Sequence, residues 1–270
     1  SHVSGFWPDN EIVRNDMLDY AFEIEHFDSH LVKMLELLEE KGELDNTVVI
    51  VTADNGMPFP RVKGQPYEYS VHMPMAIMWG KNIKRRGREI YDYLSFVDIA
   101  PTILELAGVE EPESGMQPME GKSFSDIFYT TRKGFTSGDR KHAIIGQERH
   151  DVGRPDDAGY PVRGIIKDGF LYLKNYKPGR WPAGNPETGY LNCDGSPTRT
   201  LILMMRRTGT SSDYWNLGFG LRGDEELYNI VTDPDCINNL VNKADYRDAK
   251  QNLQILLYDE LSRQNDPRVT

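Results

Sequence analysis

Apolar residues recur at intervals of three and four along residues 14–41, the spacing that places them on one face of an α-helix. The apolar positions are Met17, Leu18, Ala21, Ile24, Phe27, Leu31, Met34, Leu35 and Leu38. Gly42 follows this stretch, as glycine commonly does at the end of a helix. Residues 47–52 then form a β-branched run that is apolar on both faces, which is typical of a central strand covered by helices on both sides.

A second apolar run at 75–79 predicts another buried strand, and residues 98–108 predict a helix. Asp98 is placed to cap that helix, Pro101 lies in its first turn and Gly108 ends it. The order helix, strand, strand, helix predicts a layered α/β domain.

The pattern changes beyond Glu110, where residues 110–122 are acidic and rich in Pro and Gly, as expected of a surface loop. A short strand at 142–146 and a polar loop at 147–162 come next. Short strands are predicted at 162–166, 170–174 and 200–205, with a hairpin turn at Asp168-Gly169 and a closing helix at 245–263. This texture indicates a smaller α+β subdomain with an antiparallel sheet, and we place the two parts at 1–160 and 161–270.

Composition excludes several functions. No apolar run of the 270 residues approaches the roughly 18 that a membrane span needs, and residues 1–5 lack the pattern of a signal peptide. The net charge of −11 argues against general binding to nucleic acid or to a membrane surface, although a locally positive site could still hold an anion. Cys193 and Cys236 form neither a disulfide scaffold nor a metal motif, so one disulfide and two free thiols both stay open.

The sharpest candidate site is Thr52-Ala53-Asp54-Asn55-Gly56, at the C-terminal end of the first predicted strand. Open α/β sheets bind ligands beyond the carboxyl ends of their strands. A carboxylate and an amide there offer two hard oxygen ligands for Ca²⁺ or Mg²⁺. Taken alone, these five residues also suit an ordinary turn, so the blocks around them decide between the two interpretations.

Six blocks along the chain, in order and spacing, resemble the sulfatase family. They are Ile24–Asp28, Asp45–Gly56, Lys63-Gly64 with Tyr67-Glu68, Met73-Pro74, Asp98–Gly108, and Glu226–Asn229 with Asp233-Pro234 and Asn239-Leu240. A finer likeness to the heparan N-sulfatase branch, the sulfamidases acting on N-sulfoglucosamine, lies in Asp54–Pro60, Gly146–His150, Gly159–Arg163 and Asn265–Pro267. The resemblance implies the C-terminal part of an alkaline-phosphatase-like sandwich, a mixed sheet flanked by helices.

The resemblance also implies roles for residues near the loop after the first strand. Asp54 and Asn55 would complete a Ca²⁺ site, with Mg²⁺ as the alternative, whose other carboxylates come from an N-terminal half. Lys63 holds the family's basic position and would contact the sulfate as a point charge. The N-sulfatase branch can carry Arg at that position, and Arg61 lies two residues away, so Lys63 is preferred and Arg61 stays a candidate.

A polar loop supplies the remaining candidates. His150 and Arg154 lie in the loop that faces the substrate in the family, and they could bind sugar hydroxyls or a carboxylate. A solvated loop with one structural histidine is the competing interpretation. Arg163 is predicted to pair with a carboxylate, Trp181 to anchor a loop, and the basic run at 81–88 to be a solvated loop.

The family's nucleophile motif, Cys/Ser-x-Pro-x-Arg, is not found in this sequence, because neither cysteine has the required neighbours and Gly195 occupies the first position of Gly195–Arg199. The formylglycine made from that motif is therefore expected in the N-terminal half. That half and a sulfated saccharide are the expected partners, and a homodimer is left open. No Asn-x-Ser/Thr acceptor occurs, which favours a periplasmic or secreted bacterial protein over a lysosomal one. The chain alone is expected to be inactive. A phosphoester or phosphonate hydrolase and a non-catalytic glycan-binding module are the competing hypotheses.

Overall fold

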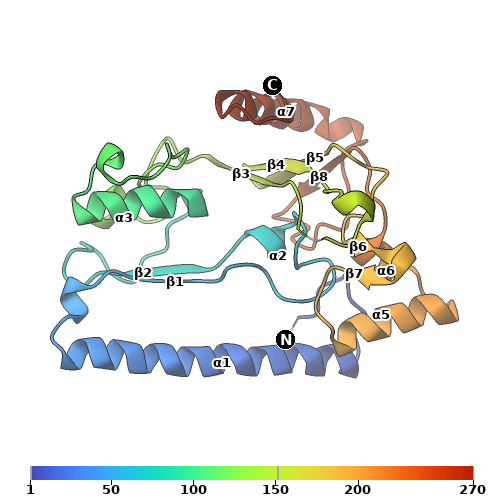
Figure 1. Cartoon of the computed structure of the whole chain (residues 1–270), viewed down its shortest axis with the longest axis horizontal. Helices are drawn as coiled ribbons and strands as arrows, with labels where there is room; N and C mark the ends of the chain where they lie inside the picture. Colours follow the sequence, from blue (N-terminus) through green and yellow to red (C-terminus); the bar gives the residue numbers. More distant parts are fainter. Residues whose placement is uncertain (1, 151, 270) are drawn as a thin grey trace.

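The computed structural model describes residues 2–150 and 152–269, and Figure 1 shows them stacked in layers above one long helix. That helix, α1 (Glu11–Glu40), begins at Asn10, whose side chain accepts a hydrogen bond from the Val13 amide at 3.1 Å. It ends at Glu40, and Gly42 follows with a φ of 70° that glycine adopts without strain. The predicted helix is thus confirmed, and it begins three residues earlier than its apolar pattern.

Above α1 lie two short strands, β1 (Val49–Thr52) and β2 (Met75–Met78), which pair antiparallel with Val49 opposite Met78. Both predicted strands are confirmed. Among the described residues β1 has one neighbouring strand rather than the two of a central strand, and no residue of either strand is fully buried. The helix α2 (Glu68–Val71) precedes β2.

The helix α3 (Ile99–Ala107) ends at Gly108, as predicted. Asp98 precedes α3, but its carboxylate accepts hydrogen bonds from the backbone amides of Ser95 and Lys122, so its side chain caps the preceding 3-10 turn instead of α3. The short helix α4 (Asp126–Tyr129) packs beside α3, and Phe124, Ile127 and Phe128 form a small core there.

The second part of the chain is built on a four-stranded antiparallel sheet in the order β3-β4-β5-β8. The strands are β3 (His142–Gln147), β4 (Val162–Lys167), β5 (Phe170–Asn175) and β8 (Glu225–Asn229). Asp168 and Gly169, with φ of 51° and 78°, form the predicted turn between β4 and β5. Because β3 pairs with β4, this sheet begins before the boundary placed at residues 160 and 161, and that division stays a prediction.

The closing helix α7 (Arg247–Arg263) covers one face of this sheet (Figure 1). Leu253, Leu257 and Leu261 pack there against Ile165 and Tyr172. The opposite face packs against residues that include Tyr67 and Tyr160. Apolar side chains therefore cover both faces of the sheet.

One predicted strand is wrong: residues 200–205 lie within the helix α5 (Pro197–Thr208). The signals that decide this lie outside the apolar run. The Ser196 side chain caps the helix by accepting from the Arg199 amide, Pro197 is its first residue and Gly209 ends it with a φ of 75°. Leu201 and Ile202 pack into a core with residues of the N-terminal segment, including Trp7 and Val13.

The remaining elements are short. They are α6 (Asp213–Phe219), the two-stranded hairpin β6 (Gly184–Asn185) and β7 (Tyr190–Leu191), and 3-10 turns at Leu44–Asn46, Phe96–Asp98, Glu111–Glu113, Pro155–Asp157, Pro186–Thr188 and Ala244–Tyr246. Among the described helices, none has the length and apolar character required to cross a membrane.

Candidate active site

The loop after β1 carries the first candidate residues, and its backbone is tightly held. Asp54 and Asn55 follow the strand directly and are exposed. Gly56 lies so close to its surroundings that a Cβ there would approach the Tyr69 carbonyl oxygen to 2.3 Å. This close approach requires glycine at position 56 and thereby fixes where the preceding carboxylate and amide emerge.

The polar atoms of this loop fit a hard cation. Asp54 Oδ1 accepts a hydrogen bond from the Asn55 amide at 2.9 Å, and the described residues offer its other oxygen no donor. The Asn55 Nδ2 donates to the Gly56 carbonyl at 2.8 Å, which leaves the amide oxygen for another partner. Carboxylate and amide oxygens are ligands of Ca²⁺ and Mg²⁺. No cluster of three or more His, Cys, Asp or Glu with metal-binding geometry occurs among the described residues, and the loop itself presents one carboxylate and one amide oxygen.

Arg61 lies inside the protein, away from the exposed loop, and its role in substrate binding stays a prediction. It is 2% exposed and has a φ of 74°. Its guanidinium lies 3.5 Å from the centre of the Tyr67 ring and donates to the carbonyls of Leu217 and Cys236. All of these contacts are inside the protein, so Arg61 ties the loop to the C-terminal part.

Lys63, in contrast, reaches the surface, with 27% of its side chain exposed. Its Nζ lies 2.9 and 3.0 Å from the two carboxylate oxygens of Asp194. The Asp194 amide in turn donates to the Pro58 carbonyl at 3.3 Å. The segment after β7 is therefore joined to the segment after β1 through both side chain and backbone.

His150 joins the same cluster from the loop after β3. It is exposed, and its ring lies against Gly64, where a Cβ would approach Nδ1 to 2.6 Å. The side-chain amide of Asn192 is in hydrogen-bond contact with that Nδ1. Three segments distant in the sequence, 54–64, 148–150 and 190–194, thus meet at one place. Asn192 and Asp194 were missed by the sequence analysis because neither belongs to a recognisable motif.

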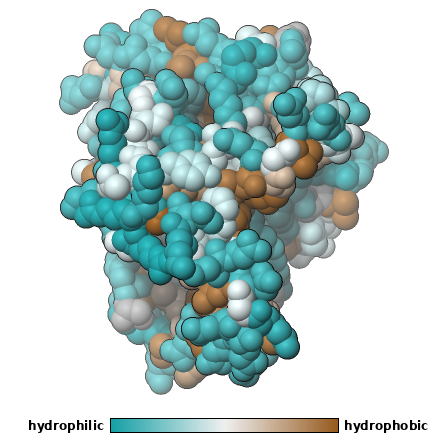
Figure 2. All heavy atoms as spheres, turned by 90° about the vertical axis from the view of Figure 1, so that its left-hand side faces the viewer, coloured by the Kyte–Doolittle hydropathy of each residue, from teal (hydrophilic) through white to brown (hydrophobic). Residues whose placement is uncertain are grey.

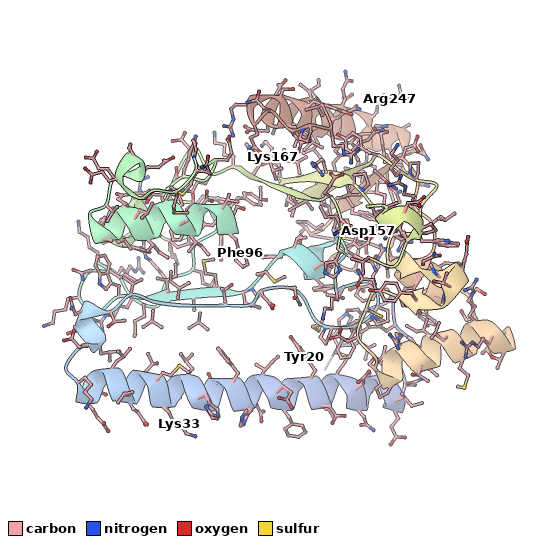
Figure 3. All side chains as sticks on the ribbon, in the orientation of Figure 1. Tyr20, Lys33, Phe96, Asp157, Lys167 and Arg247 are labelled. Atoms are coloured by element: carbon pink, nitrogen blue, oxygen red, sulfur yellow. The ribbon has the colours of Figure 1, made fainter. Side chains whose placement is uncertain are left out.

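Arg154 is not part of this cluster, although it lies in the same loop as His150. Its side chain is 6% exposed, Nε donates to the Trp181 carbonyl at 2.8 Å, and the guanidinium lies 5.7 Å from the centre of the Tyr160 ring. Arg154 therefore ties the loop to the Trp181 backbone, and its role in substrate binding stays a prediction. Figure 3 shows this part of the molecule near Asp157, which pairs with Arg149.

Other groups singled out by the sequence have structural partners. Arg163 pairs with Asp266 at 2.7 Å, as predicted, and also with Glu148 at 3.2 Å. The Trp181 ring lies 5.9 Å from that of Trp215. In the basic run 81–88, Arg86 and Arg88 donate to backbone carbonyls and Lys81 lies 3.7 Å from Asp45.

Both cysteines are free thiols and both are buried. Burial raises the pKa of the Cys193 thiol to about 11 and that of Cys236 to about 12. Both side chains are therefore protonated at neutral pH, and neither is a nucleophile in this structure.

The arrangement is similar to part of the alkaline-phosphatase-like fold. BT4656, solved with its substrate D-glucosamine-2-N,6-O-disulfate, superposes on 89% of this chain with a TM-score of 0.59 and 24% identity, over 39% of its own length. The phosphonate monoester hydrolase of Agrobacterium radiobacter superposes on 87% of this chain and 39% of its own with a TM-score of 0.58 and 17% identity.

Residues 3–109 match the model of the Sulfatase family, so this part of the chain is similar to sulfatases. An ulvan-active sulfatase of Formosa agariphila is 27% identical over 97% of this chain and 40% of its own length. The N-acetylglucosamine-6-O-sulfatase of Bacteroides thetaiotaomicron is 26% identical over 93% of this chain and 37% of its own. Human N-sulphoglucosamine sulphohydrolase is 30% identical over 41% of this chain and 22% of its own. The chain spans about 40% of the length of the first two.

Proposed function

We propose that this chain forms one side of the active site of a sulfatase that hydrolyses sulfate esters or sulfamates of glycosaminoglycan-type sugars, with N-sulfoglucosamine of heparan sulfate as the preferred substrate. The observation that carries the proposal is the junction of Lys63, His150 and Asp194 beside the Asp54-Asn55 loop. The names of the BT4656 complex and of the human relative both contain an N-sulfated glucosamine, which supports this choice of sugar.

In this proposal each exposed residue has a separate task. Asp54 and Asn55 would hold Ca²⁺, with Mg²⁺ as the alternative, and the bound ion supplies positive charge that offsets the charge developing as the S–O or S–N bond breaks. Lys63 donates a hydrogen bond to a sulfate oxygen as a point charge. His150, an exposed residue whose Nδ1 contacts Asn192, binds sugar hydroxyls and helps to orient the sugar ring.

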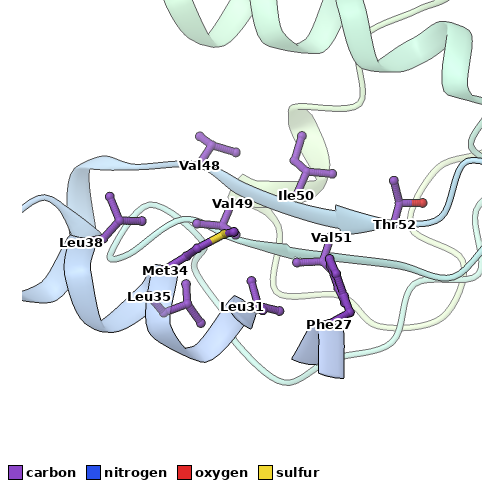
Figure 4. A pocket seen from close by; sticks show the side chains of 10 residues that line it. All are labelled: Phe27, Leu31, Met34, Leu35, Leu38, Val48, Val49, Ile50, Val51 and Thr52. Carbon is purple, nitrogen blue, oxygen red and sulfur yellow. The ribbon is translucent and has the colours of Figure 1, made fainter. Parts of the chain in front are cut away.

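The attacking group is proposed to be a formylglycine in a region that corresponds to the N-terminal part of the relatives. An apolar groove between α1 and β1 is the place where that region would pack (Figure 4). It is lined by Phe27, Leu31, Met34, Leu35, Leu38 and the strand residues 48–52. A polymeric sulfated substrate favours a periplasmic or secreted enzyme, with the lysosome as the alternative, and a homodimer stays open.

Two other functions remain as competitors. The likeness to a phosphonate monoester hydrolase favours hydrolysis of phosphonate or phosphate esters on the same fold. A non-catalytic module that binds sulfated glycans would need the exposed Lys63 and His150 but no nucleophile.

A substrate panel separates the three. Three reactions would be measured with the natural polypeptide that contains this chain. They are release of sulfate from N-sulfoglucosamine, release of sulfate from N-acetylglucosamine-6-sulfate, and release of phosphonate from a phosphonate monoester. Sulfate release, fastest from N-sulfoglucosamine, is expected, and the 270-residue chain alone should release none. Faster turnover of the phosphonate would favour the second function, and saturable binding without turnover would favour the third.

A further inference from the structure

We infer that Asp194 is a positioning residue that holds Lys63 toward the substrate and sets the charge the site accepts, favouring monoanionic sulfate esters and sulfamates over dianionic phosphate monoesters. This inference rests on the proposed function, because it assigns a substrate charge to the same site. It starts from a contact that belongs to no motif in the sequence: both oxygens of Asp194 lie within 3.0 Å of Lys63 Nζ.

The geometry of the pair leaves Lys63 able to donate. An ammonium has three N–H donors and no acceptor. Two are directed at the two oxygens of Asp194, so one is left for an incoming oxygen. The lysine side chain is 27% exposed and that of Asp194 is 56% exposed, which keeps this end of the pair open to a ligand. A free lysine would lose rotamer entropy when it bound sulfate, whereas this one is already oriented.

The backbone around Asp194 is fixed, so the carboxylate cannot simply swing away with its loop. The Asp194 amide donates to the Pro58 carbonyl at 3.3 Å, and the guanidinium of Arg199 donates to the carbonyl of the buried Cys193 at 2.9 Å. On the other side of Cys193, Asn192 contacts the ring of His150. One short segment therefore positions both Lys63 and His150.

Charge is the physical basis of the selectivity. Lys63 and Asp194 together are neutral, so Lys63 donates to a ligand without adding net positive charge to the site. Sulfate esters and sulfamates carry one negative charge at neutral pH, whereas a phosphate monoester, with a second pKa of about 6, carries close to two. Repulsion from Asp194 scales with the charge on the ligand and therefore disfavours the dianion more strongly.

The test is Asp194→Asn in the natural polypeptide that contains this chain, because the amide keeps the shape and removes the charge. Two quantities would be measured: kcat/KM for phenyl sulfate, and the dissociation constants of phenyl sulfate and phenyl phosphate at pH 8 by calorimetry. We expect kcat/KM to fall about tenfold and the binding ratio to shift about tenfold or more toward phenyl phosphate. Asp213→Asn, an exposed aspartate in the first turn of α6, is the matched control and should change neither.

An unchanged binding ratio in Asp194→Asn would overturn the inference. If Asp194→Asn fails to fold, Asp194→Ser repeats the test with a smaller neutral side chain. The two proposals can fail separately. Absence of sulfate release by the unsubstituted enzyme would reject the proposed function, while the calorimetric ratio would still decide whether Asp194 selects by charge.

Discussion

Two sheets of this protein, β1-β2 and β3-β4-β5-β8, have similar apolar strands but very different surroundings. In β4, β5 and β8 most residues are buried, and α7 covers one face with Leu253, Leu257 and Leu261. In β1 and β2 none is fully buried, and α1 below them buries only Val13 and Asp16 along its whole length. Figure 2, which views the end of the molecule where α1 finishes, shows patches of apolar side chains among larger polar areas.

The difference indicates which part of the chain holds a complete core. Apolar side chains exposed on α1 include Phe22, Ile24, Phe27, Val32, Met34 and Leu37, each at least 47% exposed. Of these, Phe27 and Met34 line the apolar groove beside β1, and a gathered apolar surface of that kind is typical of an interface. The sheet around β5 should therefore account for most of the stability of the chain, whereas α1 and β1 gain theirs from what packs on them.

The largest effect on stability is expected from Leu257→Ala, in the region where α7 covers the four-stranded sheet. Leu257 is 0% exposed and packs between α7 and the sheet, so truncation removes buried methyl groups and leaves a cavity. We expect the free energy of unfolding to fall by about 2–5 kcal/mol, measured by urea denaturation of the chain. If the free energy of unfolding fell by less than an ordinary surface substitution causes, this sheet would not be the main core of the chain.

Phe27→Ala is the matched substitution in the region of α1 and β1, and it should lower the free energy of unfolding much less. Phe27 is 54% exposed and lines the groove beside β1. The free energy of unfolding of the isolated chain should change by about 0.5 kcal/mol or less, while binding of a hydrophobic dye should decrease. A destabilisation equal to that of Leu257→Ala would show that the groove is already packed, and would remove the contrast between the regions.

The smallest effect on stability is expected from Glu148, whose ion pairs lie at the edge of the four-stranded sheet and depend on pH. A hydrogen bond from Arg268, followed by one from Arg163, lowers the pKa of Glu148 below its usual range. A carboxylate with a lowered pKa in the folded state stabilises the protein above its unfolded pKa, and this contribution is lost as the pH falls through the folded value. Glu148→Gln should therefore destabilise the chain at pH 7, by less than about 1 kcal/mol because half of the side chain is exposed.

The measurement is urea denaturation of the Glu148→Gln variant and the unsubstituted chain at pH 7 and at a series of acidic pH values. The gap between the two should close as the pH falls below the folded pKa of Glu148. A gap that is constant over the whole range would show that the carboxylate charge does not contribute.

Local signals account for what the sequence predicted correctly. The helix at α1, the strands β1, β2, β4 and β5, and the Asp168-Gly169 turn all follow from apolar spacing and from glycine at positive φ. The prediction failed at 200–205, where a mostly apolar run lies in a helix because Ser196, Pro197 and Gly209 set its ends. A prediction based on the spacing of apolar residues takes no account of residues that cap a helix.

The residues of the candidate site also fall into two groups, those that the local sequence places and those that only the fold brings together. Asp54 and Asn55 come just after β1, so their exposure could be inferred from their place in the chain. Burial of Arg61 and Arg154 depends on aromatic rings and carbonyls from distant segments, which no local pattern reveals. Asp194 reaches Lys63 across 131 residues of sequence, so only the fold could bring this pair together.

The central claim is that the loop after β1 holds a metal ion in a sulfatase active site, and Asp54→Ala tests it most directly. Calcium content and the rate of sulfate release would be measured on the natural polypeptide that contains this chain. Asp19→Ala, an exposed aspartate on α1, is the control. We predict that Asp54→Ala loses the bound ion and about 100-fold or more in rate, whereas Asp19→Ala retains both. An unchanged calcium content in Asp54→Ala would contradict the account.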